Sequence, residues 1–199
     1  MIFGLTGTMS SGKGEVVEYL KNQYGFEHFS VSSHLENLLR QEGNLDRDGL
    51  TEGASRLRRE KNDAAFLVRN IYGNLLRLGY GINDNMIIES IRNPAEIDFL
   101  RQETPFDSFF ASINTGFDTR YARSIDRGTN KDKISYQEFL RQHNQEMDSG
   151  DYYGLKVADC INKADFHIDS GYELSKVREQ VDEFVDYAYS QANGGLRNI

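Results

Sequence analysis

Apolar residues along this chain follow two patterns, short continuous runs and longer stretches with helical spacing. The continuous runs cover residues 1–7, 26–31, 85–91, 106–114 and 164–170, and each has the length of a strand buried on both faces. The stretches with apolar positions every three or four residues cover 13–24, 32–43, 50–81, 93–102, 115–128, 135–147 and 173–190. Residues 50–81 hold two helical patterns with a break near Asn62. Strands that alternate with helices predict an α/β fold with a parallel sheet covered on both faces.

Capping residues mark the starts of several predicted helices. The expected start signals are Ser33 with Glu36, Asn93 with Pro94 and Glu96, and Ser135 with Glu138, while Gly43 is the expected end of the helix at 32–43. A polar break is predicted at 129–133. We find no repeat, low-complexity tract or interdomain linker, so one domain over 1–199 is expected.

The segment MIFGLTGTMSSGKGEVVEYL, residues 1–20, joins the first predicted strand to the first predicted helix. Gly7, Gly12 and Lys13 have the spacing of a phosphate-binding loop. Glycines allow the backbone N–H groups to turn inward, the helix adds its positive end, and the lysine adds a full charge. An accidental glycine turn is the alternative, but spacing, lysine and strand–helix context all favour a nucleotide phosphate site.

Composition restricts the partners. The net charge is −8 and the sequence pI is near 5.1, which argues against a nucleic-acid or anionic-membrane surface. An anionic ligand must therefore be bound by a local cluster of cations and backbone amides. No apolar run reaches membrane length, and residues 2–6 are too short for the apolar core of a signal peptide, so a cytoplasmic protein is expected.

The remaining reactive side chains offer no other chemistry. Cys160 is the single cysteine, which excludes an internal disulfide and suits a small buried hydrophobe. The histidines at 28, 34, 143 and 167 share no metal-ligand spacing.

The sequence SGKGE, residues 11–15, resembles the loop of adenylate kinase and related nucleoside monophosphate kinases, in which glycine directly follows the lysine. IIESIRNPAEIDFLR, TRYARSIDRG with ISYQEFLRQ, and ADFHIDSGYELSKVREQV are similar to segments of the group that contains dephospho-CoA kinase and deoxynucleoside monophosphate kinases. This resemblance implies a three-layer P-loop NTP hydrolase fold with a parallel sheet and a small helical lid, here at about 128–142. It also implies ATP and Mg²⁺.

The donor site is expected in the first loop and on one helix. The loop residues predicted to bind ATP are Gly7, Thr8, Ser10, Ser11, Gly12, Lys13, Gly14 and Glu15. Glu15 stands where the family has threonine, so it either favours the helix start or holds Mg²⁺ through water. Arg120, Arg123 and Arg127 share one helix face, as phosphate ligands or as an ion-paired surface with nearby aspartates. The resemblance assigns Lys13, Arg123 and Arg127 to catalysis.

Four other residues are expected on the acceptor side of the site. The resemblance assigns Arg58 and Arg92 to the acceptor phosphate and Arg141 to the lid. Ser32, at the start of the second predicted helix, is either a substrate-side hydroxyl or a helix cap. Glu89 replaces the family's strand-end aspartate and is either a magnesium ligand or an ordinary acid. Ser90 replaces a family glycine. Structural ion pairing is the alternative for each arginine and the favoured one for Arg56 and Arg59.

These residues predict an ATP-dependent phosphotransferase that moves the γ-phosphoryl group of ATP to a (deoxy)nucleoside monophosphate. A dephospho-CoA kinase-like enzyme and a catalytically degenerate nucleotide-binding module remain the alternatives. The expected partners are small-molecule nucleotides, with no nucleic acid and no membrane, and the expected state is a monomer or homodimer.

Overall fold

Five parallel strands form the centre of the computed structural model, which describes residues 1–41, 43, 46–127 and 134–194. The strands are β1 (Ile2–Thr6), β2 (Glu27–Ser30), β3 (Met86–Ile91), β4 (Ser108–Asn114) and β5 (Phe166–Asp169). Their order in the sheet is β2-β3-β1-β4-β5, and every neighbouring pair is parallel. The predicted α/β class and parallel sheet are therefore confirmed.

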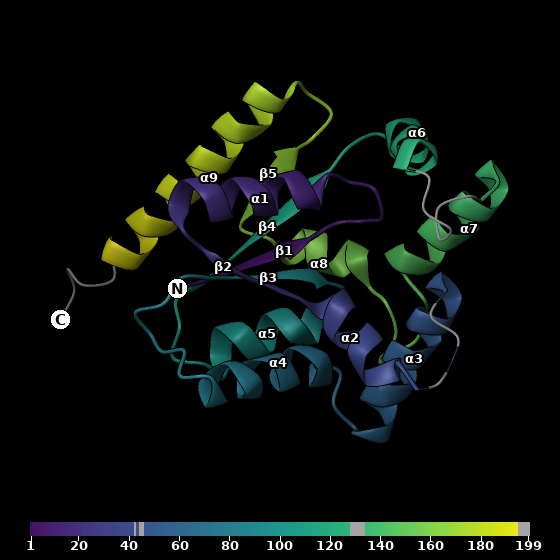
Figure 1. Ribbon diagram of the computed structural model, residues 1–199, viewed down its shortest axis with the longest axis horizontal. Coiled ribbons are helices and arrows are strands. Elements are labelled where there is room, and N and C mark those ends of the chain that lie inside the picture. The colour runs from purple at the N-terminus through teal and green to yellow at the C-terminus, as the bar shows by residue number, and fades with distance from the viewer. Residues whose placement is uncertain (42, 44–45, 128–133, 195–199) are drawn as a thin grey trace.

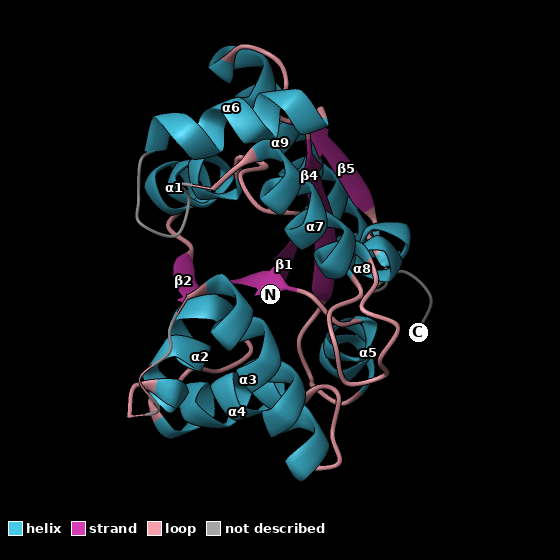
Figure 2. Cartoon of the chain, turned by 90° about the vertical axis from the view of Figure 1, so that its right-hand side faces the viewer, coloured by secondary structure: helices cyan, strands magenta, loops and turns pink. Residues whose placement is uncertain are grey.

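Helices cover both faces of this sheet (Figure 1, Figure 2). They are α1 (Lys13–Tyr24), α2 (Val31–Leu39), α3 (Arg47–Glu60), α4 (Phe66–Arg77), α5 (Pro94–Gln102), α6 (Phe117–Arg127), α7 (Tyr136–Met147), α8 (Val157–Lys163) and α9 (Leu174–Gly194). One apolar cluster joins α1 and α9 to the sheet, and a second joins α2, α4, α5 and α8 to its other face. The two clusters give the three layers that alternating strands and helices predict.

Strand β1 lies in the middle of the sheet and is buried along its whole length, as its apolar run predicts. The direction of the strand connections reverses beside β1. From β1 the chain passes to β2 and β3 on one side of it, and from β3 it crosses to β4 and β5 on the other side. The carboxyl ends of all five strands meet at one edge of the sheet. In open α/β sheets ligands bind at this edge beside such a reversal.

The pairing of β1 with β3 contains an irregularity at the same edge. Leu5 faces Glu89, but the next residue, Thr6, faces Ile91, so Ser90 has no counterpart in β1. Ser90 has φ +65°, a value that L-residues other than glycine adopt rarely. The glycine expected from the resemblance is thus replaced by a serine that keeps a glycine-like backbone.

Most helix starts agree with the sequence prediction. Asn93 and Glu96 form the predicted capping box, and Ser135 accepts the N–H of Glu138 as predicted. The start of α2 was wrong: Ser30 is its cap and accepts the N–H of Ser33, so α2 begins at Val31. Helix α8 was not predicted. Of the expected lid, residues 128–133 lie outside the described residues, residues 134 and 135 precede α7, and residues 136–142 belong to α7.

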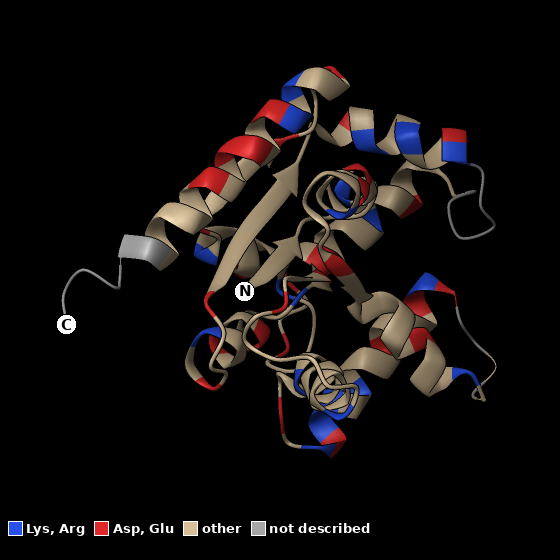
Figure 3. Cartoon of the chain, turned by 60° about the vertical axis from the view of Figure 1, so that its left-hand side comes forward, with Lys and Arg blue, Asp and Glu red and all other residues tan. Residues whose placement is uncertain are grey.

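Charged residues lie unevenly over the surface. Figure 3 shows a row of acidic residues along α9, whose buried residues Val181, Phe184 and Val185 face the sheet. None of the helices in the described part of the chain combines the length and apolar content needed to cross a bilayer.

Candidate nucleotide site

The loop between β1 and α1 has the backbone that its two glycines predict. Gly7 has φ +139° and Gly12 has φ +90°, both in the region that glycine tolerates best. A Cβ at Gly7 would lie 2.2 Å from the carbonyl oxygen of Ile113, so no larger residue fits there. Gly12 is the N-cap of α1 and provides no side-chain acceptor for the first N–H groups of the helix. The Glu15 N–H donates to the carbonyl oxygen of Gly12 at 3.1 Å, so an anion would meet the positive end of α1 and the N–H groups that precede Glu15.

Lys13 folds back over this loop. Its Nζ donates to the carbonyl oxygens of Gly7 at 2.7 Å and Thr8 at 2.8 Å. Burial, together with the charge of Arg92, lowers the pKa of Lys13 to about 8, although the carboxylates of Glu146 and Glu89 act in the opposite direction. An anionic ligand at this loop would favour the ammonium form of Lys13.

A cavity of about 1040 Å³ opens above the loop at the carboxyl edge of the sheet. Its volume exceeds that of an ordinary small-molecule pocket and suits two ligands side by side. The predicted site residues that line it are Ser10, Ser11, Gly12, Lys13, Gly14, Glu15, Ser32, Glu89, Arg92, Arg123 and Arg127. Gly7 and Thr8 are buried beneath the loop surface and are not among the residues that line the cavity.

The three arginines of α6 do not share one role. Arg123 donates to the hydroxyl and carbonyl oxygens of Ser170, at 3.2 Å and 2.7 Å, and Arg127 donates to the Ser10 hydroxyl at 2.6 Å. Arg120 is 3% exposed, donates to the Thr115 carbonyl and lies outside the cavity lining. The expected arginine face is therefore divided: two guanidinium groups reach the phosphate loop and its surroundings, and the third packs inside.

Glu89 is the one residue of β3 that is only partly buried, and it lines the cavity. Burial alone would raise the pKa of Glu89, but the polar side chains of His28 and Ser30, the hydrogen bond from Ser90 and the charge of Lys13 lower it to about 2. The Ser90 hydroxyl donates to Glu89 Oε2 at 2.6 Å. The carboxylate is thus ionised at neutral pH and held beside the lysine, which is the chemistry a hard divalent cation requires.

Glu146 of α7 is a site residue that the sequence did not indicate. It is 3% exposed, and its Oε2 accepts the N–H of Met9 in the phosphate loop at 2.8 Å. Its Oε1 lies 2.7 Å from Arg92 Nη1 in an ion pair. Nothing in the helical pattern around Glu146 separates it from the exposed acids of the same helix, because the contact depends on how α7 folds back over the sheet edge.

The remaining predicted acceptor residues lie in different places. Arg92 and Ser32 line the cavity, whereas Arg58 lies behind it, 1% exposed, with Nη2 2.6 Å from Glu96 Oε1. Arg141 is exposed and donates to Asp48 and Glu138, and it is not among the residues that line the cavity. The structure therefore brings Arg92 to the donor loop but leaves Arg58 and Arg141 in ion pairs outside the main cavity.

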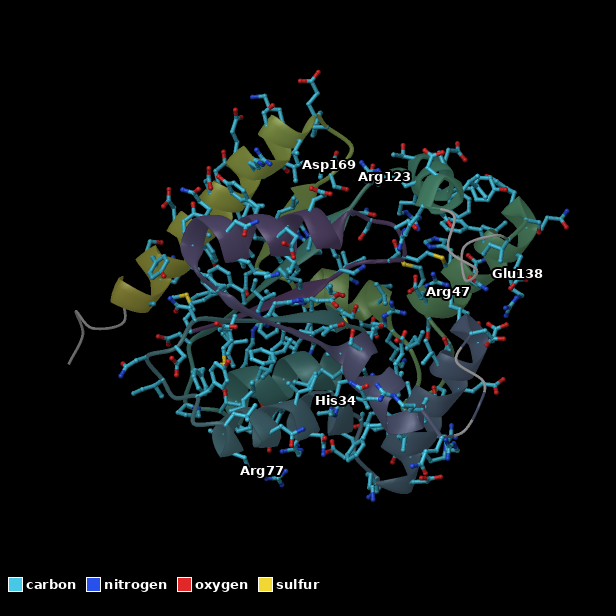
Figure 4. All side chains as sticks on the ribbon, in the orientation of Figure 1. His34, Arg47, Arg77, Arg123, Glu138 and Asp169 are labelled. Atoms are coloured by element: carbon cyan, nitrogen blue, oxygen red, sulfur yellow. The ribbon has the colours of Figure 1, made fainter. Side chains whose placement is uncertain are left out.

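Several lining residues lay outside the sequence prediction. Arg47 begins α3 and is labelled in Figure 4 together with Arg123, and both border the cavity at the carboxyl edge of the sheet. The others are Met9, Val17, Glu18, His28, Glu36, Leu50, Ser90, Ser170, Tyr172, Leu174 and Val177. Tyr172 and Leu174 are exposed apolar side chains at the cavity margin. Among the described residues no group of three histidine, cysteine or acidic side chains could enclose a metal ion.

Comparisons with known proteins agree with this architecture. No family model matches the chain. UPF0200 proteins of Pyrococcus abyssi and Methanothermobacter thermautotrophicus are 25% and 24% identical, over 93% of this chain and 95% and 89% of theirs. The names of these relatives state no activity.

Solved structures resemble the chain in fold. Shikimate kinase from Acinetobacter baumannii has a TM-score of 0.60 at 13% identity, covering 96% of this chain and 93% of that one. A gluconokinase from Sinorhizobium meliloti has a TM-score of 0.58 at 15% identity, covering 96% and 95%. At such identities the similarity establishes fold alone, and the chain has the fold of P-loop kinases.

Proposed function

We propose that this protein is an ATP-dependent phosphotransferase that transfers the γ-phosphoryl group to the phosphate of a (deoxy)nucleoside monophosphate. The observation that carries the proposal is the convergence on one cavity of the uncapped start of α1, Lys13, Arg123 and Arg127, with Arg92 in the same lining. Several cations around one large cavity suit two anionic ligands.

Separate residues would bind the donor, stabilise the charge that develops during transfer and bind the acceptor. The loop amides and the α1 terminus would bind the β and γ oxygens of the donor, and the Lys13 ammonium would turn from the loop carbonyls to the phosphates. Arg123 and Arg127 would offset the charge that develops during transfer. Arg92 would hold the acceptor phosphate, whose oxygen attacks the γ phosphorus while the bond to the β–γ bridging oxygen breaks and ADP leaves.

Glu89 fits a role toward Mg²⁺. It is ionised and lines the cavity beside Lys13, and one carboxylate with phosphate oxygens and water is the usual protein environment of this ion. Bound with the triphosphate, Mg²⁺ would supply positive charge to the β and γ oxygens. Glu15 is exposed in the first turn of α1, where a carboxylate favours the helix start.

The test is a coupled assay of ADP formation with ATP, Mg²⁺ and a panel of nucleoside monophosphates and dephospho-CoA. Lys13→Ala is expected to lower turnover at least about a hundredfold while the protein still folds. Lys21→Ala is the matched control, since Lys21 lies on the same helix and is not among the residues that line the cavity. Binding of ATP without transfer to any acceptor would instead favour a nucleotide-binding module, and turnover unchanged by Lys13→Ala would reject the assignment.

A further inference from the structure

Ser170 lies where the phosphate loop and the last two strands of the sheet meet. It directly follows β5, is 4% exposed and lines the cavity. Its Oγ lies 2.6 Å from the carbonyl oxygen of Ser11 in the phosphate loop and 3.2 Å from that of Asn114 at the end of β4. Because a serine hydroxyl has a single proton, the shorter contact is the donated hydrogen bond. The hydroxyl therefore ties the phosphate loop to the carboxyl edge of the sheet.

The same serine holds the guanidinium group of Arg123 through two atoms. Arg123 donates from Nη1 to Ser170 Oγ at 3.2 Å and from Nη2 to the Ser170 carbonyl oxygen at 2.7 Å (Figure 4 labels Arg123 and the neighbouring Asp169). A Cβ at Gly12 would lie 3.1 Å from Ser170 Oγ and 3.4 Å from Arg123 Nη1, so both groups lie against the start of α1. Within the described part of the chain these contacts use two of the five N–H donors of Arg123, which leaves three for phosphate oxygens.

Hydrogen bonds from the sheet and from α9 fix the backbone around Ser170. The Ser170 N–H donates to the Asn114 carbonyl oxygen at 2.8 Å. Gln180 of α9 accepts the N–H of Asp169 at 2.9 Å and donates to the Asp169 carbonyl oxygen at 3.0 Å. The place of Ser170 is therefore set by β4 and α9, and through Ser170 the sheet determines where the Arg123 guanidinium lies.

We infer that Ser170 is a positioning residue for phosphoryl transfer, which fixes the Arg123 guanidinium against the phosphate loop before a ligand binds. This inference rests on the proposed function, in which Arg123 offsets the charge that develops during transfer. A charged group stabilises a transition state best when it is already in place, because no reorganisation is then needed. A free arginine side chain would have to lose rotamer entropy to reach the same place. Ser170 thus acts on the transferred group through Arg123.

The test is a double-mutant cycle of Ser170→Ala and Arg123→Ala, measured with ATP, Mg²⁺ and a nucleoside monophosphate that the wild type phosphorylates. Ser170→Ala should lower kcat about tenfold and change the Kd of a non-hydrolysable ATP analogue by less than about twofold. In the Arg123→Ala background the same substitution should lower kcat by less than about twofold, because the group on which Ser170 acts is gone. A loss of about tenfold in that background as well would overturn the inference and assign the effect to the phosphate loop.

Two further variants separate positioning from packing. Ser170→Thr keeps the hydroxyl and should recover most of the kcat that Ser170→Ala loses. Ser112→Ala is the matched control, because Ser112 is also a buried serine that contacts β5, through His167, but it lies outside the cavity lining. Its kcat should equal that of the wild type. A loss as large as that of Ser170→Ala would overturn the inference, since any buried serine beside β5 would then have the same effect.

A measurement on the ligand-free protein distinguishes this inference from the proposed function. Nuclear magnetic relaxation of the Arg123 Nε–H should give an order parameter of about 0.85, and Ser170→Ala should lower it toward about 0.6, because one remaining hydrogen bond lets the guanidinium pivot. The signal is assigned by its loss in Arg123→Ala. If this decrease is found but the wild type phosphorylates no acceptor, the proposed function is rejected and Ser170 remains the residue that fixes Arg123. An unchanged order parameter would overturn the inference even in an active enzyme.

Discussion

Glu146 is a buried carboxylate whose neighbours are mostly cationic. Burial alone would raise its pKa, but the charges of Arg92 and Lys13 and the Met9 N–H outweigh burial and hold the pKa of Glu146 below the ordinary glutamate range. Through these contacts one side chain of α7 joins the donor loop to the cation proposed for the acceptor. The residue therefore positions both halves of the site without lying in the described lining of the main cavity.

Glu146→Gln should keep the Met9 hydrogen bond and lose the charge that balances Arg92. We expect the free energy of unfolding to fall by about 2–3 kcal/mol at neutral pH, because a partly buried guanidinium is left unpaired. A carboxylate with a lowered folded pKa stabilises above its unfolded pKa and loses that contribution as pH falls through the folded value. The difference between wild type and variant should therefore be largest above about pH 4.5 and shrink below it, as measured by urea unfolding across pH.

Glu138→Gln is the matched control for that measurement. Glu138 lies on the same helix, but its partner Arg141 is exposed, so the change should stay within about 0.5 kcal/mol. A pH-independent gap for Glu146→Gln would contradict the assigned ionisation of Glu146.

At the scale of the element, the loop and α1 place two glycines under opposite constraints. Gly7 has a positive φ, and the space where its Cβ would lie is taken by the Ile113 carbonyl, while Gly14 lies within α1 with nothing within 4 Å of a Cβ. Gly7→Ala should cost about 3 kcal/mol through strain and overlap. Gly14→Ala should instead stabilise by about 0.5–1 kcal/mol, because alanine is the better helix former. Guanidinium unfolding of both variants measures this, and equal effects would mean that the loop backbone differs from the one described.

The strength of the sequence pattern in each helix and strand decided how well its position could be predicted. Strands and long helices have strong periods, so their positions agree with expectation, and Asn93 with Glu96 marks its helix start unambiguously. The start of α2 was wrong because Ser30 and Ser33 are both good caps, and only the end of β2 decides between them. Helix α8 has seven residues, too few for a helical period to show. The phosphate loop is local in sequence and was predictable, but the places of Glu146 and Ser170 depend on contacts between distant segments.

For the whole molecule, the negative net charge does not reveal that cations gather at the candidate site. The chain carries −8 overall, with acids along the outer side of α9, yet Lys13, Arg92, Arg123 and Arg127 gather at the carboxyl edge of the sheet. A local cationic cavity within an acidic surface suits a small anion and disfavours a long polyanion such as nucleic acid.

Arg58 contributes to the stability of the whole molecule, because its ion pair with Glu96 links α3 to α5 across the interior. Glu96 also accepts the N–H groups of Arg92 and Asn93, so its carboxylate cannot move away if Arg58 is lost. Arg58→Met should therefore lower the free energy of unfolding by about 3–5 kcal/mol, since a fully buried charge loses its partner. Arg59→Met, which breaks an exposed pair with Asp151, should cost no more than about 1 kcal/mol. Urea unfolding of both variants decides the matter: equal costs would mean that water replaces the lost guanidinium and that α3 is not held to the sheet through this pair.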